Sequence, residues 1–364
     1  MNIKVVCDDK IPFLKGILEN AGFDAVYRPG GKISPDDVRS ADAMIVRTRT
    51  RCNAQLLTGA NVKFIATATI GFDHLDLQFL KQNNIAWTNA PGCNADGVAQ
   101  YIASCLVKYG TPGMTVGVIG VGEVGRRVVK TAQILGFNTL LNDPPRMAKE
   151  GAEGFTGLEE LLHNSDIVTV HIPGGGDNVN FANERFFRNM KKGAIFINSS
   201  RGEVVDEEAL KNAISKQRPE KIILDVWRNE PDIDSFLMNY ALEATPHIAG
   251  YSTDGKANAT LQSVRSLGRF FGVDTLANYS MENIPVPPPE NPRFALPGQE
   301  QIKAAVLHSY DAGTDTALLR GNPRSFEELR GKYRTRREFH AYTLTNVKPE
   351  SISILSALGF NLEK

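Results

Sequence analysis

Short apolar runs alternate with helix-like segments over most of the chain. In its first part these runs are IKVV, AMIVR, VKFIATAT and IAWTN, between residues 3 and 89. Continuous apolar runs are typical of strands buried on both faces, and their alternation with helices predicts a parallel sheet. A second series begins at Thr115 and comprises TVGVIGVG, NTLLND, DIVTVHIP, GAIFINSS and KIILDVW. Two such series predict two separate doubly wound α/β sheets.

Longer helical patterns and a proline-rich stretch stand beside these series. Residues 94–110 predict a helix that connects the two sheets, and residues 253–272 predict a helix that returns the chain to the first. Residues 283–298 contain six of the 19 prolines and predict an extended linker. The remaining residues, 299–364, predict a small third module of helices and strand-like segments.

Composition and charge narrow the classes of function. Lys plus Arg equals Asp plus Glu, at 41 each, which argues against nucleic-acid binding through bulk positive charge. No stretch reaches the ~18 apolar residues of a membrane helix, and the first residues do not resemble a secretion signal. The four cysteines are far apart, which disfavours a zinc site and a disulfide framework. We therefore expect a cytoplasmic protein with no metal, membrane or nucleic acid as partner.

The second series opens with a glycine-rich turn. Gly120, Gly122 and Gly125 have the GxGxxG spacing, follow a predicted strand and open a predicted helix. Asp143 ends the next strand, 18 residues after Gly125. This context is the one a dinucleotide site requires, because the glycines let the pyrophosphate approach the backbone and the acidic residue accepts the ribose diol. The alternative is a turn of structural importance alone.

The start of that helix supplies further contacts for a dinucleotide. The backbone N–H groups of Glu123 and Val124 lie in its first turn, where the helix dipole favours phosphate. A carboxylate at Asp143 repels a 2′-phosphate and so predicts NAD as the cofactor. Arg146 weighs slightly against this choice, because a nearby arginine can accommodate NADP.

Three segments bring polar residues to the ends of buried strands. Arg201 follows IFINSS, Glu230 follows IILDVW, and His247 lies in ATPHIAGYS. An arginine can hold a carboxylate in a bidentate fork, a histidine can take a hydroxyl proton, and a glutamate can orient that histidine. Each residue taken alone has an ordinary structural alternative. Together, behind a dinucleotide turn, they predict oxidation of an alcohol beside a carboxylate.

These segments resemble the D-isomer-specific 2-hydroxyacid dehydrogenases. The matching motifs are N-x-x-R-G at Asn198–Gly202, D-V-x-x-x-E-P at Asp225–Pro231 and T-P-H-I-A-G at Thr245–Gly250. The resemblance covers about residues 1 to 275. It implies that Arg201, Glu230 and His247 are catalytic. It also implies NAD contacts from Ser199, Ser200, Arg201, Asp225 and Gly250.

The same resemblance implies a domain organisation. Residues 1–93 and 247–282 would form a discontinuous substrate domain, and residues 94–246 would form an inserted Rossmann domain for NAD. The active site would then lie in the cleft between them. After the linker 283–298, residues 299–364 would form an α+β dimerisation domain. The fold class is thus two Rossmann-like parallel-sheet domains plus a small C-terminal domain, and we expect a homodimer.

Within the family, four stretches favour a branch that acts on a phosphorylated four-carbon acid. They are NAPGCNADGVAQY, NDPPR, HIAGYSTDGKA and YRTRREF. A phosphate calls for local donors. The candidates that we assign to substrate binding are Arg47, Thr48, Thr69 and Tyr251, with Lys256 nearby.

Two alternatives remain open at this point. The same scaffold could act on 3-phosphoglycerate or an unphosphorylated 2-hydroxy acid, or it could be an NAD-sensing binding protein without catalysis. A further expectation concerns the tail. The pattern FEELRGKYRTRREF predicts a helix over residues 326–339, with Arg334, Arg336 and Arg337 on its exposed face. The alternative is that one of these arginines reaches the cleft of a partner subunit.

Overall fold

The computed structural model describes residues 3–281, 284–285 and 298–363, and the chain divides into two compact units. The first unit contains Met1–Asn94 and Thr253–Pro285, and the second contains Ala95–Ser252 and Val286–Lys364. Most of the proline-rich stretch predicted as a linker, namely residues 283 and 286–297, lies outside the described residues. Both units are built on parallel sheets, which confirms the predicted α/β fold class.

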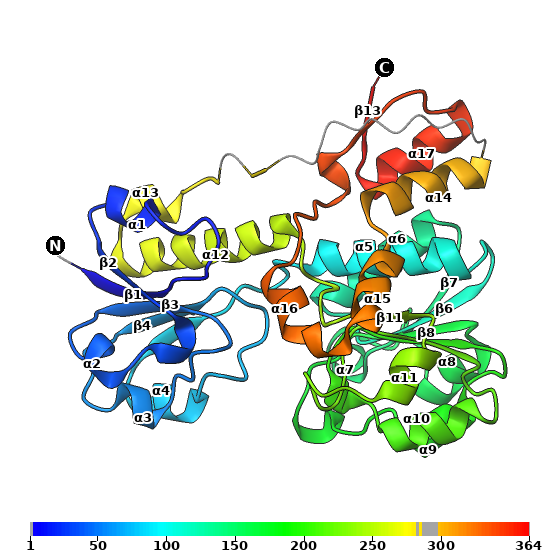
Figure 1. The fold of residues 1–364 in the computed structure, drawn as a ribbon, viewed down its shortest axis with the longest axis horizontal. Helices are drawn as coiled ribbons and strands as arrows, with labels where there is room; N and C mark the ends of the chain where they lie inside the picture. Colours follow the sequence, from blue (N-terminus) through cyan, green and yellow to red (C-terminus); the bar gives the residue numbers. More distant parts are fainter. Residues whose placement is uncertain (1–2, 282–283, 286–297, 364) are drawn as a thin grey trace. The chain divides into compact units, whose positions relative to one another are not determined.

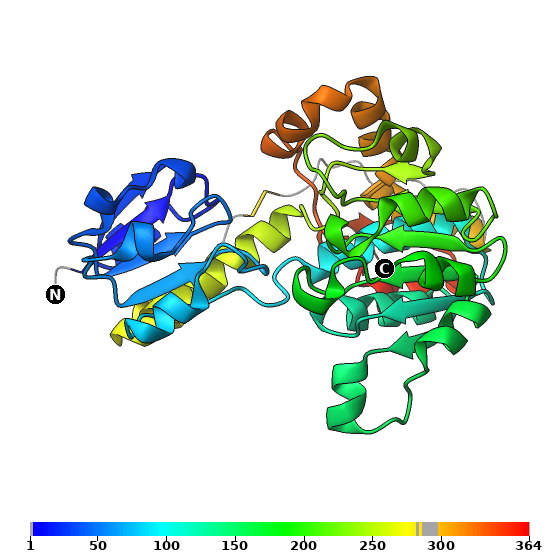
Figure 2. The same cartoon turned by 90° about the horizontal axis from the view of Figure 1, so that it is seen from below.

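The first unit is a five-stranded parallel sheet in the order β2–β1–β3–β4–β5. The long helix α12 lies along one face of this sheet and contacts β4 (Figures 1 and 2). The ring of Phe270 on α12 stacks on that of Phe64 on β4, with 4.7 Å between the ring centres. The strands are β1 Lys4–Asp8, β2 Asp24–Arg28, β3 Ala43–Val46, β4 Phe64–Thr67 and β5 Ala86–Thr88. The helices are α1 Ile17–Asn20, α2 Pro35–Val38, α3 Ala54–Leu57, α4 Leu77–Gln82, α12 Thr253–Phe271 and α13 Asp274–Ala277.

The second unit contains a six-stranded parallel sheet in the order β11–β10–β9–β8–β6–β7. The strands are β6 Thr115–Ile119, β7 Asn138–Asn142, β8 Ile167–Val170, β9 Ile195–Asn198, β10 Lys221–Leu224 and β11 Glu243–Ala244. The helices are α5 Ala95–Tyr109, α6 Glu123–Ile134, α7 Pro144–Glu150, α8 Leu158–Asn164, α9 Glu184–Asn189, α10 Glu207–Ile214 and α11 Ser235–Tyr240. The chain order reverses between β6 and β8, and such a switch point is where open α/β sheets bind ligands.

The C-terminal residues pack on this second unit. Helix α14 lies against α5, and α17 contacts both α14 and α6 (Figure 1). The elements are α14 Gly298–Ser309, α15 Ala312–Gly321, α16 Phe326–Gly331, β12 Thr343–Leu344, α17 Pro349–Leu358 and β13 Asn361–Leu362. No helix of the part that the structure describes is long and apolar enough to cross a membrane.

The helix predicted over residues 326–339 is wrong in its second half. Helix α16 ends at Gly331, and residues 333–338 carry no regular structure. Arg336 and Arg337 are 2% and 6% exposed, so they do not lie on a solvated helix face. The cause is tertiary: Arg336 donates to carbonyl and amide oxygens of other segments, and a local pattern cannot predict these partners.

Candidate active site

The glycine-rich turn follows β6 and opens α6. Gly120 has φ 82°, and a Cβ on it would lie 2.6 Å from the carbonyl oxygen of His171. A Cβ on Gly125 would lie 1.9 Å from the oxygen of Gly120, so only glycine lets helix and strand approach this closely. A Cβ on Gly122 would meet no atom within 4 Å. The backbone beside Gly122 is therefore open to a pyrophosphate, and this turn fits a dinucleotide.

Asp143 stands at the end of β7, beside this turn. Its Oδ2 accepts the N–H of Val121 at 2.7 Å, and its Oδ1 accepts the N–H of Arg146 at 3.0 Å. The carboxylate thus caps α7 and is fixed next to the glycine turn. The guanidinium of Arg146 pairs with Glu150 at 2.6 Å and donates to the carbonyl of Val121. Since Arg146 is already engaged, the charge offered at this strand end is the carboxylate, which favours NAD.

The side chain of Glu123, at the start of α6, is paired with arginines of its own helix and is not a candidate for binding phosphate. It accepts hydrogen bonds from Arg126 and Arg127, and these pairs lower the pKa of Glu123 although burial opposes the shift. The predicted cofactor contacts of Glu123 and Val124 therefore rest on their backbone N–H groups.

The turn after β9 carries the next predicted residues. The side-chain amide of Asn198 donates to the carbonyl of Arg201 at 2.9 Å, and its oxygen accepts the N–H and Oγ–H of Ser200. Asn198 thus fixes the turn that presents Arg201. The Oγ of Ser199 is buried and has no hydrogen-bond partner among the described residues. A buried hydroxyl without a partner is the exception in proteins and is consistent with a contact that a bound cofactor completes.

Gly202 brings this turn against the loop after β10. A Cβ on Gly202 would lie 1.9 Å from the carbonyl oxygen of Trp227, so a larger residue would push the two loops apart. Strand β10 pairs with β9 and β11 on either side, with Leu224 opposite both Asn198 and Ala244. Arg201, Glu230 and His247 therefore follow the carboxyl ends of three adjacent strands.

His247 and Glu230 form a hydrogen-bonded pair. The Nδ1–H of His247 donates to Oε2 of Glu230 at 2.8 Å, and Oε1 of Glu230 accepts the N–H of Trp227 at 2.9 Å. Burial opposes the charge of Glu230, but the hydrogen bond and positive charge of His247 outweigh it, so the pKa of Glu230 lies below its ordinary value. The pair leaves Nε2 of His247 as the nitrogen that can exchange a proton with a ligand.

Asp225 lies beneath the loop that carries His247. It is 1% exposed and accepts hydrogen bonds from Oγ1 of Thr245 and from the N–H groups of Ile248 and Ala249, at 2.7 to 3.0 Å. Burial raises its pKa against the charge of His247 and these bonds. Both carboxylate oxygens are occupied by this loop, so the structural role of Asp225 is to hold it. Its contact with NAD, and that of Gly250, stay predictions.

The predicted substrate residues Arg47, Thr48 and Thr69 belong to the first unit. Arg47 follows β3 and forms an ion pair with Asp8, with Nε 3.1 Å from Oδ2. Thr48 is exposed, and Thr69 donates to the carbonyl of Gly71 at 2.7 Å. Burial and the nearby charge of Arg47 lower the pKa of Lys256, at the start of α12. This unit therefore offers two cations near each other.

Tyr251 follows the His247 loop and meets a residue that sequence reasoning missed. Arg330, from α16, donates to the hydroxyl of Tyr251 at 3.1 Å and lies 5.7 Å from its ring centre. Its charge also contributes to the lowered pKa of Glu230. No local motif marks Arg330, because its partners are distant in the sequence. The only signal is its place in a basic stretch, residues 326–339, that was predicted to be helical.

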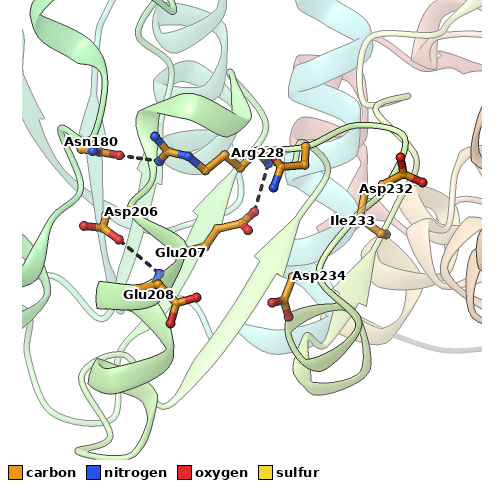
Figure 3. Close-up of a pocket in the computed structure, with 9 residues that line it drawn as sticks. Asn180, Asp206, Glu207, Glu208, Arg228, Asp232, Ile233 and Asp234 are labelled. Atoms are coloured by element: carbon orange, nitrogen blue, oxygen red, sulfur yellow. Dashed lines mark hydrogen bonds between the residues drawn. The ribbon is translucent and has the colours of Figure 1, made fainter.

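A polar pocket of about 370 Å³ lies beside the loop that leads to Glu230 (Figure 3). Its acidic side chains have structural partners: Asp206 and Asp234 cap α10 and α11, and Glu207 accepts the N–H of Arg228 at 3.0 Å. Arg228 in turn donates to Asn180. None of the predicted catalytic residues lines this pocket. Its polar side chains instead hold the loop that leads to Glu230.

Comparison with known proteins gives the class. Residues 101–249 match the family described as D-isomer specific 2-hydroxyacid dehydrogenase, NAD binding domain, and residues 287–359 match a Domain of unknown function (DUF3410). The fold is similar to a cofactor (NAD+) bound 3-phosphoglycerate dehydrogenase from Entamoeba histolytica, with a TM-score of 0.64 and 24% identity over 76% of this chain and 97% of that one. The chain belongs to the D-isomer specific 2-hydroxyacid dehydrogenases, and NAD is its cofactor.

Relatives over nearly the whole chain carry a more particular name, erythronate-4-phosphate dehydrogenase. One from Bacteroides fragilis (strain YCH46) is 43% identical over 95% of this chain and 100% of its own length. One from Escherichia coli O1:K1 / APEC is 38% identical over 99% of this chain and 98% of its own length. These relatives cover 95% and 99% of this chain, whereas the Entamoeba structure covers 76% of it.

Proposed function

We propose that the protein oxidises 4-phospho-D-erythronate to (R)-3-hydroxy-2-oxo-4-phosphooxybutanoate with NAD, a step in pyridoxal 5′-phosphate (vitamin B6) biosynthesis. The name of its full-length relatives supports this substrate. The observation that carries the chemistry is the 2.8 Å hydrogen bond between His247 and Glu230, beside the turn that presents Arg201. NAD, when bound, supplies the hydride acceptor.

The residues of the second unit perform three tasks in this reaction. Arg201 holds the substrate carboxylate in a two-point fork, which orients the neighbouring carbon. His247 takes the C2 hydroxyl proton on Nε2 as the hydride leaves C2, and Glu230 stabilises the positive ring that results. In the reverse direction the protonated His247 returns that proton to the 2-oxo oxygen. The glycine turn, Asp143 and the Ser199 hydroxyl would hold NAD.

The first unit supplies the candidates for the phosphate. A phosphate monoester carries about −1.5 to −2 charge near pH 7. Arg47 and Lys256 are close enough for one charge to lower the pKa of the other, and bringing a dianion to such a pair relieves their repulsion. Thr48 and Thr69 of the first unit and Tyr251 of the second remain further candidate donors. We also propose that the chain is a cytoplasmic homodimer that dimerises through residues 299–364.

A substrate panel with NAD tests the substrate, using 4-phospho-D-erythronate, D-erythronate, 3-phosphoglycerate and D-lactate. We expect the first to have the highest kcat/KM. A higher kcat/KM for any of the other three would replace the proposed substrate. NAD binding without turnover of any of them would favour the alternative of an NAD-sensing protein.

Lys256→Met refines this test. Charge-assisted hydrogen bonds contribute ~1.5–3 kcal/mol, so we expect KM for 4-phospho-D-erythronate to rise about 10- to 100-fold. The KM for unphosphorylated erythronate should change little, because it lacks the group that Lys256 binds. Lys63→Met, which removes an exposed lysine of the same unit, is the control. Equal effects of Lys256→Met on both acids would contradict a phosphate role.

A further inference from the structure

Three stretches of the sequence meet at the loop that follows His247. Helix α5 contributes Gly97 and Gln100, the loop itself contributes residues 248–252, and the C-terminal segment 333–338 runs between them. These are the stretches NADGVAQY, HIAGYS and YRTRREF, by which the chain resembles the phosphorylated-substrate branch of its family.

Arg336 is the centre of this meeting point. It is 2% exposed, and its guanidinium lies 3.6 Å from the ring centre of Tyr310. Its Nε–H donates to Oε1 of Gln100 at 2.9 Å, and a terminal nitrogen donates to the carbonyl of Gly97. The other terminal nitrogen donates to the carbonyls of Ile248 and Ala249, at 3.3 and 3.0 Å.

The same two residues are also bound by Asp225, which contacts their N–H groups. Its carboxylate accepts the N–H groups of Ile248 and Ala249, at 2.7 and 3.0 Å. The backbone that follows His247 is thus held between a buried carboxylate on its N–H groups and a buried guanidinium on its carbonyls. Charged partners make the stronger protein hydrogen bonds, and a fully satisfied buried network fixes one conformation.

His247 needs such support because its own backbone is unusual. It has φ 56°, in the left-handed region that non-glycine residues rarely occupy. Conformations of this kind persist at functional sites only where the surroundings over-determine them. The carboxylate of Asp225 and the guanidinium of Arg336 together fix the direction in which the chain leaves His247.

The surroundings are matched to Arg336 and its segment. The side-chain amide of Gln100 accepts from Arg336 and donates to the carbonyl of Arg337 at 3.0 Å, which a glutamate could not do. Ser252 donates to Oε1 of Glu338 at 2.6 Å. A Cβ on Gly97 would lie 3.0 Å from the Oγ of Ser252, so glycine leaves room for this contact beside α5.

We propose that Arg336 is a positioning residue for the acid–base His247, and that the C-terminal segment is thereby part of the catalytic apparatus. Arg336 does not touch the reacting atoms. It acts through the backbone of Ile248 and Ala249, which sets the position of the imidazole. The proposal rests on the proposed dehydrogenase function for its kinetic test, and a structural test stands beside it.

The experiment compares Arg336→Lys with Arg334→Lys in the full-length protein. Lysine keeps the charge but lacks the fork that reaches Gln100, Gly97 and the loop together. Arg334 belongs to the same segment but pairs with Asp315 instead of the loop, so it is the matched control. Displacement of a catalytic group by about 1 Å costs ~100-fold, so we expect kcat of Arg336→Lys to fall about 10- to 100-fold. We expect the Kd for NAD to stay within about twofold.

Two readouts separate positioning from a general loss of folded protein. With substrate deuterated at C2, the isotope effect on kcat should rise in Arg336→Lys, because hydride transfer becomes slower relative to product release. A smaller folded fraction would lower kcat and leave the isotope effect unchanged. Hydrogen exchange followed by mass spectrometry should show faster exchange in a peptide spanning residues 245–252, because the amides of Ile248 and Ala249 lose their fixed geometry.

The outcomes are distinct. A kcat within threefold of wild type, an unchanged isotope effect, unchanged exchange of residues 245–252, or an equal loss in Arg334→Lys would each overturn the proposal. If Arg336→Lys does not fold, Gln100→Met takes its place and is judged by the same criteria, since it removes the acceptor that orients the guanidinium. A wild-type protein that does not oxidise any acid would defeat the proposed function alone, and the exchange measurement would still decide the role of Arg336.

Discussion

At the scale of single residues, His247 combines a proposed role in proton transfer with an unusual backbone conformation. Asparagine adopts left-handed conformations more readily than alanine, so His247→Asn removes the imidazole with little backbone disturbance. General acid–base catalysis contributes about 10²–10⁴-fold, and we expect kcat to fall by that amount. NAD affinity, measured by fluorescence titration, should stay the same. Alanine at this position should give the same loss of turnover with a larger loss of stability.

His163→Asn is the matched control for this substitution, because His163 is exposed at the end of α8. It should retain wild-type kcat and KM. Turnover of His247→Asn above about a tenth of wild type would contradict the role of His247 as the proton acceptor.

Glu230 makes the stability of the second unit depend on pH. The pKa of Glu230 is lower in the folded protein than in the unfolded chain. Ionised Glu230 therefore stabilises the fold at a pH above its pKa in the unfolded chain, and this contribution is lost as the pH falls through the lowered pKa of the folded state. We expect Glu230→Gln to be less stable than wild type near neutral pH. The difference should shrink as the pH falls below about 4.5.

Trp227 offers a local probe for this measurement. The chain has two tryptophans, and Trp87 lies in the first unit, so a Trp87→Phe background leaves Trp227 beside Glu230 as the fluorophore. Urea unfolding from pH 7 to 3.5, followed by this fluorescence, gives the urea midpoints of the Glu230 and Glu230→Gln proteins at each pH. A difference between the two midpoints that stays constant through this range would contradict the contribution of the Glu230 carboxylate.

At the scale of elements, the glycine turn before α6 is tightly packed at Gly120 and Gly125 but open at Gly122. Gly122 is the N-cap residue of α6, and a Cβ there meets no protein atom. Gly122→Ala should therefore leave the melting temperature within a few degrees of wild type. The same methyl group would occupy the space that the pyrophosphate needs, so the Kd for NAD should rise at least tenfold. Calorimetry and NAD titration measure the two quantities.

Gly157 provides the control, because it is the N-cap residue of α8 and its Cβ position is also open. Gly157→Ala should match the effect of Gly122→Ala on stability and leave NAD affinity unchanged. Equal NAD affinity in the two variants would argue against phosphate binding at Gly122.

Elements were predictable from the sequence where burial alone decides the pattern. The central strands β6, β8 and β9 are nearly fully buried and gave continuous apolar runs. Strand β2 is partly exposed at the sheet edge, so DAVYR shows no such run and was missed. Strand β11 has only two residues, too few for a pattern.

The residues of the site likewise fall into those that the sequence predicts and those that it does not. The predicted catalytic motifs are short, since each strand end and its turn lie within a few residues, and the family resemblance could be read from them. The supports of these motifs are distant in the sequence. Arg336 bonds to Ala249 across 87 residues and to Gly97 across 239, and Arg330 bonds to Tyr251 across 79. Local periodicity carries no information about such partners. It predicted a helix for the stretch that contains both arginines, with Arg336 on its exposed face.

At the scale of the whole molecule, the C-terminal residues have one face packed on the rest of the second unit and one that is exposed. Helix α14 buries Ile302 and Val306 next to α5, whereas Ile352 on α17 is 45% exposed. Removing the segment by truncation would uncover α5 as well as any subunit contact. A single exposed side chain therefore tests dimerisation more cleanly than a deletion does.

We expect the full-length protein to have twice the chain mass in light scattering, and Ile352→Asp to weaken this dimer, because a charge placed in an apolar contact loses its hydration. The dimer dissociation constant should rise at least tenfold, with an unchanged melting temperature at concentrations where both proteins are monomeric. Phe236→Asp is the control: Phe236 is 51% exposed on α11, outside the C-terminal segment. A wild-type monomer, or equal weakening by the two substitutions, would refute dimerisation through this face. If Arg336 serves its own subunit, monomeric Ile352→Asp should also keep wild-type kcat, since the contacts from Arg336 to the His247 loop are made within one chain.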